Sequence, residues 1–178
     1  MEFFEMAIAE LSAAPGRVED AIRGLTEEQL SWKPTEFFSI RENVLHLRDI
    51  DILGYEKRLR LILTEDYPVL ADIDGTKLAI ERNYNAQPVG PALDDLKRSR
   101  GTSMQRLRGT SIPDLNRRAE MQGFGPIDVH RLLELWIEHD RGHLADLAEA
   151  RSALDAGQGP TLAPHQAACK EPALYRDF

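Results

Sequence analysis

Residues 129–147 of the chain read VHRLLELWIEHDRGHLADL. At about 100° of rotation per residue, six of these side chains share one helical stripe less than about 90° wide: Val129, Leu132, Trp136, His139, His143 and Leu147. The stripe is apolar apart from its two histidines. The pattern therefore predicts a helix over about residues 127–154 that points both histidines into the core.

Two imidazoles four residues apart on one helical face can chelate a single metal ion. A lone inward histidine is more often a hydrogen-bonded core residue, so the pair needs support from elsewhere in the chain. His46 gives that support, because it lies on a second predicted core helix and can supply a third ligand. We therefore predict a divalent metal site at His46, His139 and His143. Zinc, nickel, iron and manganese all accept imidazole, so the pattern does not select among them.

A zincin protease is the competing interpretation of this helix, since those enzymes use His-Glu-x-x-His with the glutamate as general base. This chain has Asp140 at that position, with a shorter side chain, and no third histidine follows at the metzincin spacing. Asp140 falls on the metal-facing stripe, where we expect it to orient an imidazole or to act as a base. Asp49 follows His46 by one turn and is either a similar orienting group or a solvated carboxylate.

The rest of the chain predicts three more long helices. One runs over about residues 3–24 with a kink at Pro15-Gly16, one over about 39–63 from the capping box at Ser39, and one over about 91–108. A second capping box, at Thr26, starts a short helical turn. The connection 64–91, with a short helix near 76–84, is long enough to cross a bundle. Strand patterns are absent, so the predicted fold class is all-α.

We expect one domain, residues 1–154, followed by an irregular tail over residues 155–178 that contains His165 and Cys169. We interpret His130, His165 and Cys169 as residues outside the site. The second helix carries apolar residues on nearly every face, which suits a central helix or one that meets a partner chain. A homodimer is the prediction that follows from this pattern.

The composition argues against several partners. Lys and Arg total 22 against 30 for Asp and Glu, and the net charge of -8 repels nucleic acid. A basic cluster at helical spacing is interpreted as a solvated helix face; it consists of Lys97, Arg98, Arg100, Arg106 and Arg108. No apolar run is long enough to span a membrane. The single cysteine rules out an intrachain disulfide and fits a reducing compartment, so we expect a cytoplasmic protein.

Two stretches carry a family resemblance. They are Ser39-Ile-Arg-Glu-Asn-Val-Leu-His46-Leu-Arg-Asp49, and Phe124-Gly-Pro-Ile-Asp-Val followed by Leu135-Trp-Ile-Glu-His139-Asp140-x-x-His143-Leu. With them, about residues 1–152 resemble the DinB-like (YfiT-like) metalloprotein superfamily. The resemblance implies an up-down four-helix bundle with a long crossover connection, often dimeric. It also implies a three-histidine metal site of the kind found in bacillithiol and mycothiol S-transferases.

Three neutral imidazoles leave coordination positions open, as catalytic sites do and closed structural sites do not. We therefore expect an enzyme with a small-molecule substrate. The resemblance favours a thiol S-transferase that uses a low-molecular-weight thiol, and a metal-dependent hydrolase is the alternative. A third hypothesis is a non-catalytic metal-binding stress-response module whose ion only joins two helices.

Overall fold

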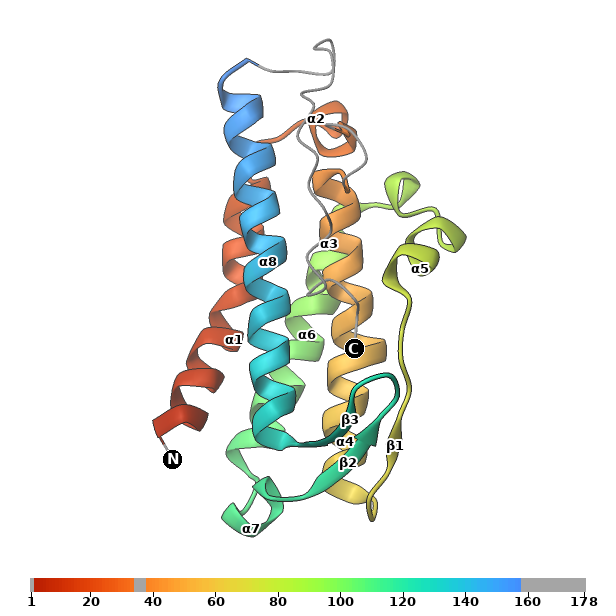
Figure 1. The fold of residues 1–178 in the computed structure, drawn as a ribbon. Helices are drawn as coiled ribbons and strands as arrows, with labels where there is room; N and C mark the ends of the chain where they lie inside the picture. The colour runs from red at the N-terminus through yellow and green to blue at the C-terminus, as the bar shows by residue number, and fades with distance from the viewer. Residues whose placement is uncertain (1, 34–37, 158–178) are drawn as a thin grey trace.

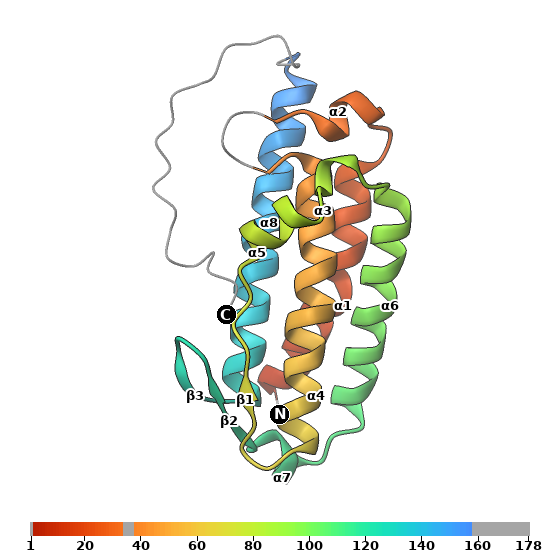
Figure 2. The same cartoon turned by 90° about the vertical axis from the view of Figure 1, so that its right-hand side faces the viewer.

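The computed structural model describes residues 2–33 and 38–157 of the chain. Four long helical segments form a bundle, as Figures 1 and 2 show. They are α1 (Glu2–Ile22), the continuous run of α3 (Ile40–Asp49), η1 (Ile50–Glu56) and α4 (Lys57–Thr64), α6 (Val89–Arg108), and α8 (Val129–Asp155). Helices α1 and α3 each pack on both α6 and α8. The predicted helical bundle is confirmed.

Shorter elements occupy the connections. Helix α2 (Glu27–Ser31) separates α1 from α3, and a long crossover joins α4 to α6 through β1 (Val69–Leu70), α5 (Gly75–Glu81) and η2 (Tyr84–Ala86). The connection from α6 to α8 contains α7 (Ile112–Leu115), β2 (Arg118–Met121) and β3 (Gly125–Asp128). Figure 2 shows the crossover returning along the side of the bundle, so that α6 runs in the same direction as α3.

The helix starts follow the capping residues of the sequence. The Ser39 hydroxyl accepts a hydrogen bond from the Glu42 amide (3.0 Å), and the Glu42 carboxylate accepts one from the Ser39 amide (2.7 Å). Thr26 and Gln29 form the same reciprocal pair at the start of α2. Each box satisfies amide groups that the first turn of a helix leaves unpaired. Helix α1 continues through Pro15 without a break.

The second long helix changes its period at Ile50. Its backbone is π-helical over Ile50–Glu56, and a π-helix has more residues in each turn than an α-helix. In an uninterrupted α-helix, Tyr55 would lie about 180° from His46, on the opposite face. In the structure its ring instead stacks on Trp136 of α8, with 4.9 Å between ring centroids and 7° between ring planes. The Tyr55 hydroxyl donates to the Leu135 carbonyl (3.1 Å).

This change of period explains why the apolar residues of the helix fall on nearly every face of a wheel drawn at the α-helical period. Leu59 and Ile62 are fully buried within the bundle. Gly54 packs against the crossover, where a Cβ atom would meet the Ile73 side chain at 3.4 Å. Much of the apolar surface that suggested a partner chain is therefore covered by the chain itself. The homodimer stays a prediction.

The expected absence of strands is wrong. Strand β1 pairs in parallel with β2, which pairs antiparallel with β3, and the small sheet lies at the end of the bundle where α8 begins (Figure 1). The side chains of Ala119, Met121 and Ile127 point inward and are buried in the core. Each strand has four residues or fewer, and Pro126 within β3 argues against a strand. The alternating pattern was too short to detect.

The basic cluster on α6 is not a solvated face throughout. Arg98 is exposed and pairs with Asp95 (2.7 Å), as the sequence interpretation requires. Arg100, however, is only 2% exposed. It follows Leu93 by seven residues and precedes Met104 by four, and both spacings put it on the buried stripe of the helix. The solvated interpretation of Arg100 is therefore wrong.

Asp49 fastens the crossover to α3. Its carboxylate accepts hydrogen bonds from the Tyr84 hydroxyl (2.5 Å) and from Arg82 (2.9 Å), and it lies 2.6 Å from the Arg48 guanidinium. Burial and the adjacent carboxylate raise the pKa of Tyr84 well above its usual value, so the phenol stays protonated and donates. Because Asp49 is buried, its interpretation as a solvated carboxylate is wrong.

No helix within residues 2–33 and 38–157 combines the length and the apolar character that crossing a membrane requires. Helix α8 ends at Asp155, one residue beyond the predicted boundary of the bundle. Most of the predicted tail, including His165 and Cys169, lies outside the described residues.

The anchor at Asp49 predicts a stability difference between two tyrosines. Tyr84→Phe removes a buried hydrogen bond to a charged acceptor, so it should lower the free energy of unfolding by about 2 kcal/mol. Tyr67→Phe is the matched control, because that hydroxyl bonds Glu120 on the exposed surface and should contribute less than about 0.5 kcal/mol. Urea unfolding of both variants checks the difference, and equal losses would contradict it.

Candidate metal centre

Helices α3 and α8 pack side by side and bring the three predicted histidines together. The Nε2 atoms of His46 and His139 lie 3.2 Å apart, and one ring nitrogen from each of His46, His139 and His143 falls within 4.8 Å of the others. Two nitrogens bound tetrahedrally at about 2.0–2.1 Å from one ion would stand about 3.3 Å apart. The spacing of the ring nitrogens therefore fits a shared divalent cation.

Asn43 determines which nitrogen His143 can offer. The Asn43 amide nitrogen donates to the Ser39 carbonyl (3.1 Å), so its oxygen faces the ring of His143. This oxygen lies 2.8 Å from His143 Nδ1 and can only accept a hydrogen bond, so Nδ1 carries the proton and donates it to that bond. The proton on Nδ1 leaves the lone pair of Nε2 for a metal ion, an arrangement typical of metal-binding histidines.

Two carboxylates approach the ligand histidines, and both stand beside Nδ1 atoms. Asp140 Oδ1 lies 3.7 Å from His139 Nδ1, and Asp146 Oδ2 lies 3.8 Å from His143 Nδ1. Burial acts to raise the pKa of Asp140, but the Arg100 guanidinium and the His139 ring outweigh it and hold that pKa below its ordinary value. Asp140 is therefore an anion that stands beside the His139 ring.

The sequence interpretation missed three residues around this centre. Asn43 precedes His46 by three residues and so shares its helical face. The spacing alone could therefore have indicated that Asn43 lies near the site. Arg100 lay on the inward stripe of α6 but was assigned to a solvated face. Asp51, buried in the π segment, pairs with Arg100 at 2.7 Å. The direction of its side chain depends on the π-helical segment, which the sequence pattern did not predict.

Other singled-out residues lie away from the centre. His130 sits at the start of α8, half exposed, with its ring stacked on Phe3 (3.8 Å between centroids) and 3.4 Å from Glu134. Trp136 is fully buried and Trp32 is partly buried, as expected for packing residues.

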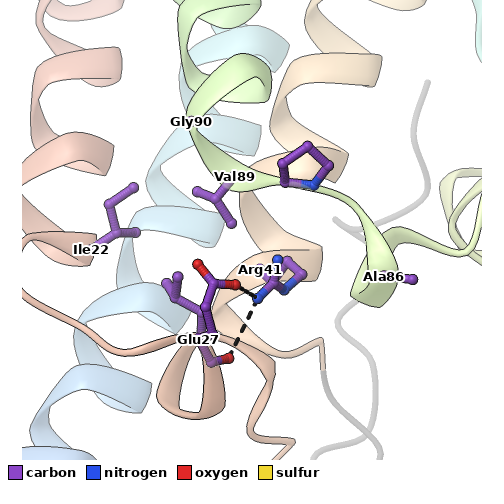
Figure 3. Close-up of a pocket in the computed structure, with 8 residues that line it drawn as sticks. Ile22, Glu27, Arg41, Ala86, Val89 and Gly90 are labelled. Atoms are coloured by element: carbon purple, nitrogen blue, oxygen red, sulfur yellow. Dashed lines mark hydrogen bonds and ion pairs between the residues drawn. The ribbon is translucent and has the colours of Figure 1, made fainter.

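A surface pocket of about 550 Å³ lies at the end of the bundle where α1 ends and α6 begins. Its lining residues are Ile22, Glu27, Leu30, Arg41, Ala86, Pro88, Val89 and Gly90, and Figure 3 shows six of them labelled. The three histidines are not among them. Within the pocket Arg41 is already bonded to Glu27 and to the Gln87 carbonyl (2.7 Å), so the guanidinium ties α2 and the crossover to α3.

Comparison with known proteins identifies the family. A family model described as the DinB superfamily matches residues 10–147, which contain all three histidines. The chain belongs to the DinB superfamily. The resemblance stated from the histidine motifs is thereby confirmed.

Relatives of this DinB superfamily chain carry names that refer to a metal. One, from Oceanobacillus iheyensis, is named "Putative metal-dependent hydrolase" and is 26% identical over 141 residues, covering 79% of this chain and 81% of the relative. Another with the same description, from Halalkalibacterium halodurans, is 24% identical over 147 residues, covering 82% and 85%.

A solved structure shares the fold. YfiT from Bacillus subtilis superimposes with a TM-score of 0.78 at 22% identity, covering 86% of this chain and 87% of YfiT. It is described as "a probable metal-dependent hydrolase with an unusual four-helix bundle topology". At this identity the likeness establishes the fold of this DinB superfamily chain.

The centre predicts stoichiometric metal binding. Purified protein should hold about one divalent ion per chain, and His46→Ala, His139→Ala or His143→Ala should each weaken binding by more than about 100-fold, because each removes one of three ligands. His130→Ala is the control on the same helix and should bind like the wild type. Elemental analysis and chelator competition measure both quantities. Full metal content in His46→Ala, with loss in the other two, would rule out the three-ligand site.

The Asn43 contact predicts a smaller effect. Asn43→Ala removes the acceptor that orients His143, which should lower metal affinity by about 10- to 100-fold while the protein stays folded. Asn85→Ala is the matched control, since Asn85 also bonds Ser39 but approaches it from the crossover. Competition with a chromophoric chelator gives both affinities. An Asn85 variant as weak as the Asn43 variant would mean that the effect comes from packing near Ser39.

Proposed function

We propose that the chain is a metal-dependent S-transferase that delivers a low-molecular-weight thiol to a small electrophile. Three observations support a metal centre as the site of the reaction: the family, the three converging histidines, and the names of the relatives, which include the words "metal-dependent". The choice of a thiol over water rests on one observation, which is the side from which carboxylates approach the histidines.

A residue that activates water has to stand near the space that the ligand nitrogens face. Asp140 and Asp146 instead approach Nδ1 atoms, on the outer edge of the rings. Both oxygens of Asp140 are also engaged by Arg100, at 2.6 and 3.2 Å. A thiol ionises near pKa 8.5 without any metal, whereas water, near about 15.7 in bulk, ionises at neutral pH only when a metal ion lowers its pKa, so a thiol depends less on a neighbouring base. This arrangement favours thiol chemistry.

Each residue has a separate task in this proposal. His46, His139 and His143 would hold the ion through their ring nitrogens. A divalent ion so held supplies positive charge that favours the ionised form of a thiol. Asn43 keeps the proton of His143 on Nδ1, and Asp140 stabilises the proton on the Nδ1 atom of His139. Both contacts keep the opposite nitrogen of each ring available.

Hydrolysis is the second candidate, and the names of the two curated relatives favour it. The third hypothesis, a metal that only joins helices, is favoured by the burial of the ligand side chains, which are 3 to 6% exposed. Buried ligands are compatible with all three functions, so activity measurements must separate them.

The test is an assay of metal-loaded protein with two panels. One combines cysteine, glutathione or coenzyme A with electrophiles such as chlorodinitrobenzene and a maleimide, and the other offers esters and amides without thiol. We expect thiol conjugation that falls at least about 100-fold in His46→Ala, because the ion contributes several kcal/mol. His130→Ala should keep the wild-type rate.

Other outcomes would decide against thiol transfer. Turnover of an ester or amide without thiol, lost in His46→Ala and kept in His130→Ala, would establish the hydrolase instead. Metal-loaded protein that is silent in both panels would leave the non-catalytic metal-binding module.

A further inference from the structure

The bundle buries one guanidinium beside the metal centre. Arg100 of α6 donates to the Leu11 carbonyl of α1 (2.9 Å), to Asp51 of η1 (2.7 Å) and to Asp140 of α8 (2.6 and 3.2 Å). Its guanidinium also lies over the Trp136 ring, 4.7 Å from the ring centroid. Arg100 thus contacts groups from each of the other three long helices.

Stability is a poor explanation for this arrangement. Removing a guanidinium and two carboxylates from water costs several kcal/mol for each ion, and the attraction between them often does no more than offset that cost. Apolar side chains of similar volume would fill the same space at least as well. The position of the group therefore points to another role.

The contacts continue from Arg100 to a metal ligand. Asp140 Oδ1 lies 3.7 Å from His139 Nδ1, and on the other side of the same ring His139 Nε2 lies 3.2 Å from His46 Nε2. Asp140 follows His139 directly in α8, so the two side chains leave the helix about 100° apart. Helix geometry alone therefore does not set the carboxylate against the ring. The bidentate pair with Arg100 fixes the direction of the carboxylate through the forked geometry of the guanidinium.

Asp51 and Asp140 play different parts around the same guanidinium. Asp140 engages two nitrogens of Arg100 through two oxygens, whereas Asp51 is bonded through Oδ1 alone. Asp140 is also the one of the two that stands beside a ligand histidine, with Oδ1 3.7 Å from His139 Nδ1. Asp51 therefore completes the hydrogen-bonded surroundings of the guanidinium, and Asp140 is the carboxylate that reaches the histidine.

We propose that Arg100 is a positioning residue for the metal centre: it holds Asp140 against His139 Nδ1 and thereby aims the His139 ring at the ion. This inference rests on the proposed metal centre and adds a residue from a helix that contributes no ligand. The buried ion pairs of Arg100 with Asp51 and Asp140 would then serve to orient a metal ligand.

The test compares two isosteric variants, Asp140→Asn and Asp51→Asn. Each removes one carboxylate charge from the same guanidinium, but only the first removes the group beside His139. We expect Asp140→Asn to lower the Co²⁺ and Zn²⁺ affinity by about 10- to 100-fold, as loss of an orienting partner does, and Asp51→Asn to stay within about threefold of wild type. Chelator competition gives the affinities, and circular dichroism shows that both variants are folded.

The visible absorption spectrum of the Co²⁺-loaded protein reports ligand geometry apart from stability. It should change in Asp140→Asn and stay unchanged in Asp51→Asn. Arg100→Gln should give the same altered spectrum as Asp140→Asn. Arg100→Lys should give a spectrum between that one and the wild-type spectrum, because a lysine keeps the charge but not the forked geometry. If Arg100→Gln fails to fold, Arg100→Lys, which keeps the buried charge, still tests whether Arg100 sets the position of Asp140.

Equal losses of affinity in the two aspartate variants, or wild-type affinity and spectrum in Asp140→Asn, would overturn the proposal. A wild-type protein that binds neither ion would overturn the metal centre itself, and with it this inference. A protein that binds metal as described here but catalyses no reaction would contradict only the proposed activity. The three failures are therefore distinguishable.

Discussion

The guanidinium of Arg100 is the constraint on which the bundle depends most. A buried charge must meet its partners, and those partners come from α1, from the π segment and from α8. The observed register of the four long helices brings these groups together, and a register that separated them would leave a buried charge uncompensated. The observed register also places Asp140 beside His139 and sets α8 against α3.

Two irregular features shape the side of the bundle around α3. The crossover carries the chain back along the bundle so that α6 runs parallel to α3, and Asp49 holds it there through Tyr84 and Arg82. The π segment then turns Tyr55 onto Trp136, directly before the turn of α8 that bears His139. Local π-helical turns are often found at functional sites, and here the turn also delivers Asp51 to Arg100.

Membership of the DinB superfamily and a shared fold with YfiT do not by themselves select a reaction, because one fold can host several chemistries. The residues around the histidines must therefore be used to distinguish the possible reactions. In this chain Asn43 bonds the Nδ1 atom of His143, and Asp140 and Asp146 stand 3.7 and 3.8 Å from the Nδ1 atoms of His139 and His143. Carboxylates on that side of the rings are badly placed to take a proton from a molecule on the opposite side. That placement is the physical basis for proposing a thiol, which needs less help from a base than water does.

Local sequence was sufficient to predict the long helices, both capping boxes and the inward histidines, because helical period and helix starts are properties of neighbouring residues. It also indicated the family, through motifs on α3 and α8. It did not predict the three short strands, the π segment, the burial of Arg100 or the contact from Asn43 to His143. Those features depend on partners from distant parts of the chain. A periodic pattern reports which face of a helix turns inward, whereas only the packing of one helix on another decides which groups meet there and which buried charges are compensated.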